Sequence, residues 1–524
     1  MIGDIMKKII LAIVIVCQLF MVGCIQKKNV EDKEENTLLT YGMEEFPKTL
    51  VLKEDSKERS EDLICSLFDG LVTIGSNKEI IGSLAESYEV TNDGIGYTFK
   101  LREDIKWSNG KPIVASDFVE FFKNILDPSL KNPYASELYS IYGAKEFNEG
   151  KKTFKDVAIN STDNKTLNIR MNNANEEFLK ILSKPNYRLR KNFNKLYNYT
   201  SSYKEIEYSG PYVIEDLKEN EFILLKRNEG YWDKVEENQV KLVRNSPEKS
   251  LASFNSGKTD IIFNIPLKET SIDTSMGNLE FYPTGDMFAL LFNHSKKDLG
   301  GNLSFRKAIN ESVKLLYNEE DLYSKAGLIQ GKGDMAFKNY NEDVMQTSGG
   351  YKGDVDISKI KSIFKDMDYD EKTVINMVFL NDNKNKLIAE KLEEILKDQL
   401  ELSINKKFLN QEEFNKTLED GEYDLALKFY KQPVKKEDFF KLWTKDNKRN
   451  ISRYNNGEYD KILNKVLVDK EKDFITPISI LSRDITYIPV YYDSLSYAIS
   501  KEVSGVELDG NNNILLKKVN KNNK

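Results

Sequence analysis

The amino-acid sequence predicts an α/β protein built from more than one domain. First, the chain has 524 residues, which is long enough for two or three domains with hydrophobic cores of their own. Second, strand and helix patterns alternate between Val374 and Leu427 in the order β-α-β-α-β, which implies right-handed crossovers and an open α/β sheet. Third, runs rich in aromatic and β-branched residues recur earlier in the chain, so hairpins are expected there.

An early hairpin is predicted in the first quarter of the chain. Tyr88–Val90 and Tyr97–Leu101 have strand composition, and the second run alternates apolar and polar side chains as a half-buried strand does. Asn92–Gly94 tolerates the positive φ of the turn between them. Ser116 is the expected N-cap of the next helix. The apolar residues of that helix recur at i, i+3, i+4 and i+7, at Phe118, Phe121, Phe122 and Ile125.

A second hairpin and a strand–helix–strand unit follow. Tyr212–Leu217 and Phe222–Lys226 are the predicted strands of the hairpin. Ser246 is the expected cap of a short helix that begins at Pro247. Val240–Val243 is the strand before this helix and Ile261–Phe263 is the strand after it, and the unit is expected to be parallel.

The clearest α/β pattern lies in the last third of the chain. Val374–Leu380 is a nearly continuous apolar run, as expected for a strand covered on both faces. The helix Lys386–Gln399 and the strand Leu402–Phe408 come next. An Asn-x-x-Glu capping box that begins at Asn410 starts a second helix, and Tyr423–Leu427 is the third strand.

The residues after this third strand are the candidate ligand site. Ligands of open α/β sheets bind beyond the carboxyl ends of the strands. Phe429, Tyr430, Lys431 and Gln432 stand at that place and are therefore the expected ligand-binding residues. The alternative is that the two aromatic rings only complete the core and that Lys431 points to solvent.

The first 23 residues have the organisation of a lipoprotein signal peptide. Two lysines precede the apolar run Ile9–Val22, which is too short to span a membrane. Residues 21–24 resemble a bacterial lipobox, which implies lipid attachment at Cys24. The charged residues 24–36 are then a tether, and the mature protein is expected on the outer face of the cytoplasmic membrane. An uncleaved anchor is the alternative.

Composition argues against several other classes of protein. The net charge of −7 and the lack of a basic stripe argue against nucleic-acid binding. With Cys17 in the signal peptide and Cys24 lipidated, only Cys65 remains, in an apolar context typical of a buried, inert thiol. His294 is the single histidine and is interpreted as structural or surface-exposed, so no metal site, catalytic triad or cofactor is expected.

Several segments together resemble the family-5 extracellular solute-binding proteins, which deliver oligopeptides, dipeptides or nickel chelates to ABC importers. The strongest match is Ser83–Phe118, and further matches are Ser209–Tyr212, Gly230–Asp233, Phe288–Asn293 and Tyr487–Tyr492. The resemblance implies a periplasmic-binding-protein-like clamshell of two α/β lobes with an extra lobe. It also implies a monomer that binds an extended peptide through its backbone, with an ABC permease and its ATPase as partners.

The resemblance also gives expected domain boundaries. After the signal peptide (1–23) and the tether (24–36), lobe I comprises 37–75, 205–282 and 485–524, the extra lobe II comprises 76–204, and lobe III comprises 283–484.

One departure from the family concerns the ligand. The family usually has an aspartate after the strand that matches Tyr423–Leu427, where it pairs with the amino terminus of the peptide, but Lys431, Gln432 and Pro433 stand here. The ligand's identity therefore stays open, and a nickel chelate is disfavoured by the single histidine. Beside a transport receptor, the alternatives are a membrane-anchored sensor of a peptide signal and, less favoured, a secreted hydrolase. No G-x-S-x-G, H-E-x-x-H or Cys–His pairing supports an enzyme.

Overall fold

The computed structural model describes residues 38–51, 59–76, 79–265, 275–316, 329–330, 355–367, 369, 372–431, 436–469 and 473–522. The predicted signal peptide and tether, including Cys24, lie outside the described residues. The chain forms two compact units: unit 1 is the described part of Met1–Phe263, Ile272–Asn278 and Ala498–Lys524, and unit 2 that of Asn264–Ser271 and Leu279–Tyr497. Strands β12 (Gly277–Phe292) and β17 (Tyr487–Ser500) carry the chain from one unit into the other.

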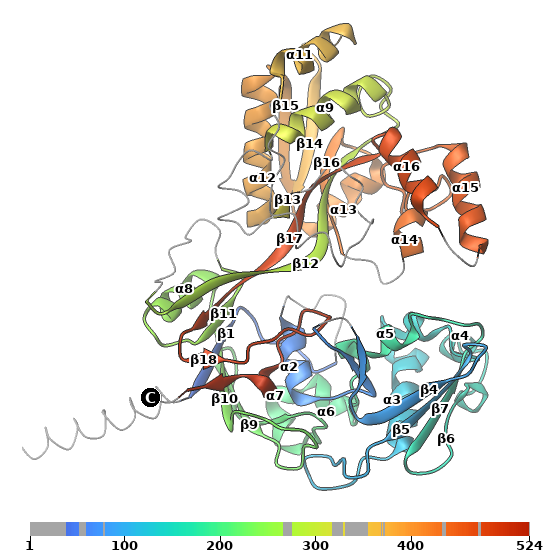
Figure 1. The fold of residues 1–524 in the computed structure, drawn as a ribbon, viewed down its shortest axis with the longest axis vertical. Coiled ribbons are helices and arrows are strands. Elements are labelled where there is room, and N and C mark those ends of the chain that lie inside the picture. Colours follow the sequence, from blue (N-terminus) through green and yellow to red (C-terminus); the bar gives the residue numbers. More distant parts are fainter. Residues whose placement is uncertain are drawn as a thin grey trace, which may run out of the picture. The chain divides into compact units, whose positions relative to one another are not determined.

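The main sheet of unit 1 combines parallel and antiparallel strands (Figure 1). Its strands in order are β11 (Ile261–Phe263), β1 (Leu39–Met43), β10 (Gln239–Arg244), β9 (Phe222–Arg227) and β8 (Tyr212–Lys218). The predicted hairpin is confirmed as β8 and β9, which pair antiparallel. The predicted parallel unit is confirmed as well, because β1 pairs in parallel with both β10 and β11 and lies between them. Helix α8 (Pro247–Asn255) connects those two strands and is capped by Ser246 as predicted.

A second sheet of unit 1 is wholly antiparallel. Its strands in order are β4 (Ala85–Val90), β5 (Gly96–Leu101), β7 (Thr166–Arg170) and β6 (Ile159–Ser161). Helix α3 (Ala115–Leu126) lies against β6 and β7 and buries the predicted aromatic face. The predicted cap Ser116 is wrong: Val114 is the N-cap, because the Asp117 carboxylate accepts a hydrogen bond from the Val114 N–H at 3.1 Å and so fixes the first turn.

Short elements complete unit 1. Its other helices are α2 (Ser60–Leu67), α4 (Ala144–Asn148), α5 (Phe178–Leu182), α6 (Phe193–Tyr197) and α7 (Tyr199–Ser202). Its two-stranded pairs are β2 (Val72–Ile74) with β3 (Ile80–Gly82), and β18 (Val503–Ser504) with β19 (Asn520–Lys521). Within the described ranges of the whole chain, no helix has the length and apolar character needed to cross a bilayer.

Unit 2 contains the predicted open α/β sheet. Its strands in order are β15 (Ser403–Leu409), β14 (Val374–Leu380), β16 (Leu425–Tyr430), β12 and β17, and β13 (Ile329–Gln330) pairs with β17. β14 runs parallel to β15 and to β16, which confirms the β-α-β-α-β order, whereas β12 runs antiparallel to β16. The helices of unit 2 are α9 (Leu303–Leu316), α11 (Ile357–Asp366), α12 (Asn383–Glu393), α13 (Gln411–Asp420), α14 (Lys436–Lys441), α15 (Gly457–Val468) and α16 (Ile475–Arg483).

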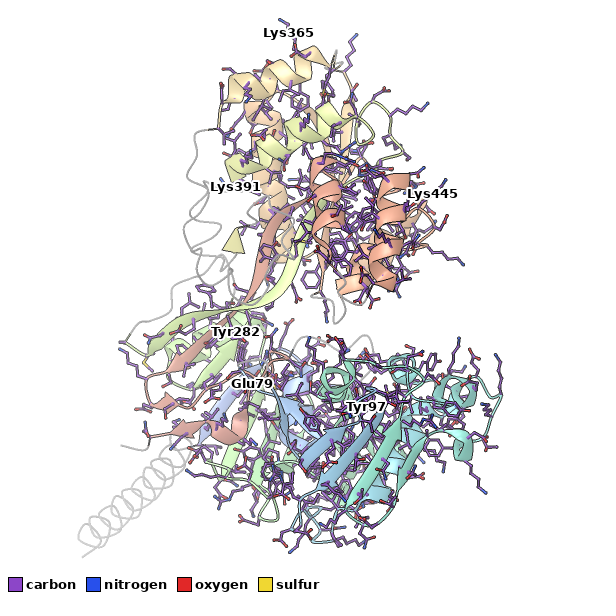
Figure 2. The ribbon with its side chains drawn as sticks, turned by 45° about the vertical axis from the view of Figure 1, so that its right-hand side comes forward. Glu79, Tyr97, Tyr282, Lys365, Lys391 and Lys445 are labelled. Carbon is purple, nitrogen blue, oxygen red and sulfur yellow. The ribbon has the colours of Figure 1, made fainter. Side chains whose placement is uncertain are left out.

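Two hydrophobic cores cover the two faces of this sheet. On one face Phe288 and Leu290 of β12 pack with apolar residues of α9, α11 and α12. On the other face Met287 and Ala289 pack with apolar residues of α13, α14, α15 and α16. Figure 1 shows the two helix groups, and Figure 2 shows exposed lysines such as Lys365 on α11 projecting away from the sheet. This layering explains why β14 has a nearly continuous apolar sequence.

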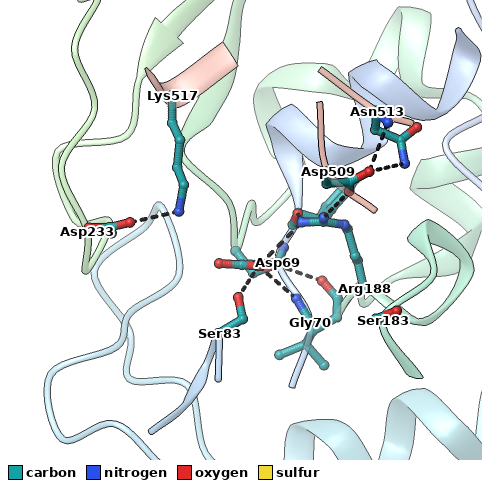
Figure 3. Close-up of polar contacts among 12 residues, drawn as sticks. Asp69, Gly70, Ser83, Ser183, Arg188, Asp233, Asp509, Asn513 and Lys517 are labelled. Atoms are coloured by element: carbon teal, nitrogen blue, oxygen red, sulfur yellow. Dashed lines mark hydrogen bonds and ion pairs between the residues drawn. The ribbon is translucent and has the colours of Figure 1, made fainter. Parts of the chain in front are cut away.

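A buried polar network stabilises unit 1 (Figure 3). The Asp69 carboxylate forms an ion pair with Arg188 at 3.3 Å and accepts hydrogen bonds from the hydroxyls of Ser83 and Tyr231. Arg188 also lies 3.8 Å from the Asp509 carboxylate. Although burial opposes ionisation, Arg188 and the hydrogen bonds hold the pKa of Asp69 below its usual range. The network therefore joins segments that are far apart in the sequence.

Candidate functional site

Strand β16 has one fully paired edge and one edge that loses its partner near the carboxyl end. On the first edge β12 pairs with the whole strand, from Phe292–Leu425 to Met287–Tyr430. On the second edge β14 pairs only at Met377–Leu425 and Val378–Ala426. Among the described residues no other strand pairs there. Alternate backbone N–H and C=O groups of residues 427–430 are therefore without a strand partner on this side.

The strand extends further than the sequence predicts. The predicted end at Leu427 is wrong, because antiparallel pairing with β12 continues to Tyr430. Phe429 and Tyr430 thus lie within the strand, on opposite faces, and not beyond it. The Phe429 ring packs on Phe288 with centroids 4.9 Å apart, and the Tyr430 ring packs edge-on against Phe439 at 5.7 Å. Both side chains are half-buried and pack against the cores of the sheet.

The predicted cation Lys431 follows the strand directly. Its side chain is exposed, and it forms no ion pair with any residue that the structure describes. Gln432 lies outside the described residues. Phe429, Tyr430 and Lys431 therefore share the carboxyl end of β16, but only the two aromatic side chains contact the cores.

Lys428 is a candidate that the sequence analysis missed. It lies inside β16, half-buried, and faces Ala289 across the ladder with β12. The signal that could have found it is the period-2 alternation of a strand: carried past Leu427, it places Lys428 on the same face as Tyr430.

Polar residues also gather at the carboxyl end of β14. Asp382 caps α12 by accepting a hydrogen bond from the Asn385 N–H at 2.8 Å, and the Lys384 ammonium pairs with Asp493 at 2.6 Å. Asn385 Oδ1 and Ser494 Oγ are buried without a hydrogen-bond partner among the described residues. An ordered water molecule or a bound polar group could supply the hydrogen bonds that these two buried atoms lack.

Cys65 and His294 both have structural surroundings. Burial raises the pKa of the Cys65 thiol well above its usual value, which disfavours the reactive thiolate. The Nε2–H of His294 donates to the Thr486 carbonyl at 3.1 Å, and burial lowers the pKa of His294 to about 4. The imidazole is therefore neutral near pH 7, as a packed side chain, and of the two earlier interpretations of His294 the structural one applies.

Comparisons with known proteins agree with this architecture. The model of the bacterial extracellular solute-binding proteins, family 5 Middle, matches residues 79–450, which is most of the chain. The chain is 25% identical to the oligopeptide-binding protein OppA of Bacillus subtilis over 517 residues, covering 92% of each chain. It is 25% identical over 476 residues to the dipeptide-binding protein DppE of the same organism, covering 84% of each chain.

The fold is shared with solved structures. The ABC transporter substrate binding protein CtaP of Listeria monocytogenes superimposes with a TM-score of 0.71 at 18% identity, over 93% of this chain and 99% of that chain. This likeness confirms the predicted periplasmic-binding-protein-like α/β fold. The match of the family model over most of the chain shows that the protein belongs to the bacterial extracellular solute-binding proteins of family 5.

Proposed function

We propose that the protein is an extracytoplasmic solute-binding lipoprotein that captures an oligopeptide-like ligand for an ABC importer. The observation that carries the proposal is the edge of β16 that, among the described residues, has no strand partner beyond Ala426. Two relatives named above bind oligopeptides and dipeptides, by their names, which supports a peptide as the solute. Because these relatives are binding proteins, the proposed role is binding without catalysis.

The proposed mode of binding is strand addition. An extended peptide would pair its backbone with residues 427–430, in the way that peptides extend an exposed sheet edge. At about 3.3 Å per residue, this edge matches a peptide segment of about four residues. Backbone pairing depends little on side-chain identity, so the mode suits a receptor for peptides of varied sequence. The proposed contacts are the backbones of Phe429 and Tyr430, followed by Lys431 and Gln432.

The proposed receptor acts as a monomer whose partners are an ABC permease and its ATPase. Its proposed lobes are 37–75 with 205–282 and 485–524 for lobe I, 76–204 for the extra lobe II, and 283–484 for lobe III.

Capture of a peptide mixture tests the proposed function. The purified full chain is incubated with random tetrapeptides, desalted, and analysed by native mass spectrometry. We expect ions of the protein with one tetrapeptide bound. The matched control is the same mass concentration of free amino acids, which cannot form a ladder and should not be retained. Failure to retain any tetrapeptide at millimolar concentration would contradict the proposal.

Lipid attachment at Cys24 has its own test. The short apolar run before this cysteine suits a cleaved signal peptide, and a lipid with two chains is enough for stable anchoring. We expect Cys24→Ala to release the protein from the membrane fraction or to leave it unprocessed. Cys65→Ala is the control. Because Cys65 is buried within unit 1, this substitution should leave membrane fractionation unchanged. A Cys24→Ala protein that fractionates and migrates like the wild type would refute the anchor.

A further inference from the structure

Lys428 places a cation on an otherwise apolar face of the unit 2 sheet. Its position on β16 faces Ala289, and the neighbouring residue on the same face of β16, Ala426, belongs to the hydrophobic core. The next residue on this face is Tyr430, whose ring centroid lies 5.7 Å from the Lys428 ammonium. Lys428 therefore lies within the part of β16 that lacks a second strand partner among the residues that the structure describes.

No anionic group of the described residues balances this cation. The Lys428 ammonium has no ion pair or hydrogen bond among them, and the ring of Tyr430 is its one polar contact there. Burial lowers the pKa of Lys428, and no nearby carboxylate raises it. By contrast, Lys384 and Lys406 of the same unit pair with carboxylates at 2.6 Å. A half-buried cation without a partner is costly unless something else supplies the counter-charge.

The ring of Tyr430 also lies near Trp443. The Trp443 ring lies 6.4 Å from the Tyr430 ring, and Trp443 Nε1 is buried without a hydrogen-bond partner among the described residues. The Tyr430 hydroxyl likewise makes no hydrogen bond with a described residue, and burial raises its pKa, so it stays protonated. The Lys428 ammonium and the Trp443 ring thus both lie near the ring of Tyr430, and among the described residues neither the ammonium nor the indole N–H has an acceptor.

We propose that Lys428 is a specificity-determining residue that binds a carboxylate of the peptide ligand. The inference rests on the proposed function, and it names the substrate class more closely as peptides with an acidic side chain or a free carboxyl terminus at this position. A carboxylate supplies both the counter-charge and the acceptor oxygens that the Lys428 ammonium lacks among the described residues. Lys431 is the weaker candidate for this role, since its exposed ammonium is already solvated.

Matched peptides provide the test. The probes are tetra-alanine, its carboxyl-terminal amide, four variants with one glutamate at each position, and the four corresponding glutamine variants. Calorimetry on the wild-type chain should find one acid/amide or glutamate/glutamine pair that differs about 10- to 100-fold in Kd, as expected for a hydrogen bond to a charged group. The pair identifies which carboxylate of the peptide is bound.

Three variants assign that preference to Lys428. Lys428→Met, of similar length and without charge, should abolish the preference, whereas Lys428→Arg should keep it. Lys365→Met, at an exposed position on α11 away from the proposed site, is the matched control and should keep it too. The midpoint of thermal unfolding of Lys428→Met should not fall, because an unpaired half-buried charge is removed.

The outcomes separate the inference from the function on which it rests. Tetrapeptides that bind with no preference for an acid, or a preference that survives Lys428→Met, would overturn the inference alone. A lower unfolding midpoint with an unchanged preference would make Lys428 structural and would also overturn it. A wild-type chain that binds no tetrapeptide would overturn the proposed function and this inference together.

Discussion

Replacing Arg188 with methionine is expected to lower the free energy of unfolding of unit 1 by about 3–5 kcal/mol, the usual cost of breaking a buried ion pair from one side. The Arg188 side chain is 7% exposed and its two carboxylate partners, Asp69 and Asp509, are 5% and 0% exposed. Arg188 also donates a hydrogen bond to the Phe68 carbonyl at 3.1 Å. The variant would leave two carboxylates buried without their cation.

Urea denaturation followed by circular dichroism measures this effect. Arg227→Met is the control, because Arg227 pairs with Glu229 at 3.5 Å with a side chain 38% exposed, and exposed pairs contribute at most about 1 kcal/mol. The difference from wild type should be largest near pH 7. A carboxylate with a lowered pKa, such as Asp69, stabilises the fold above its unfolded pKa of about 3.9 and loses that contribution as the pH falls through its folded pKa. If Arg188→Met and Arg227→Met lower the free energy of unfolding equally at pH 7, the buried network around Arg188 does not stabilise unit 1.

Phe288→Ala should lower the free energy of unfolding of unit 2 by about 3–5 kcal/mol, the range for truncating a buried phenylalanine. Phe288 is 5% exposed. Its ring stacks on Tyr491 with centroids 4.4 Å apart and contacts Phe429 at 4.9 Å. Because Phe288 lies directly opposite Phe429 in the ladder, the cavity would also loosen the strand end to which we assign the ligand.

The matched variant Phe288→Leu keeps most of the volume and should cost roughly 1–1.5 kcal/mol. Both are measured by urea denaturation, and tetrapeptide affinity should fall more for the alanine variant than for the leucine variant. A cost below about 1 kcal/mol for Phe288→Ala would show that the ring does not support β16.

Local patterns predicted much of unit 2. Val374–Leu380 is β14 with the predicted bounds, because its apolar run reflects burial on both faces. Asn410 caps α13 by accepting from the Glu413 N–H at 3.0 Å, as the capping box predicts. Both features depend on residues close together in the sequence, and such features can be read from the sequence alone.

Long-range pairing explains what was missed. The end of β16 is set by pairing with β12, whose residues are more than a hundred positions earlier, so the apolar run up to Leu427 did not reveal it. Lys428 was passed over for the same reason. Arg188 lies in a polar stretch without clear periodicity, and its partner Asp69 is 119 residues away. No local pattern marks such a residue as buried.

The start of the helix that follows β14 was also missed, although its cap is a local feature. The sequence predicts a helix over Lys386–Gln399, but α12 begins at Asn383, where Asp382 provides the cap. The rest of the predicted helix, Glu394–Gln399, follows α12 as a π-helix. The cap was missed because Asp382 and the residues after it are polar and outside the apolar stripe on which the prediction rested.

Hydrogen exchange at β16 measures whether a bound peptide adds a strand to this part of the sheet. Amide exchange of the full chain is compared with and without a tetrapeptide that the capture experiment identifies. Strand addition predicts slower exchange in the segment covering residues 427–430, because alternate N–H groups there gain a hydrogen-bond partner. The segment covering β8 and β9, already paired to each other, is the internal control and should not change. If saturating peptide leaves amide exchange at residues 427–430 unchanged and protects only other segments, strand addition at β16 is contradicted.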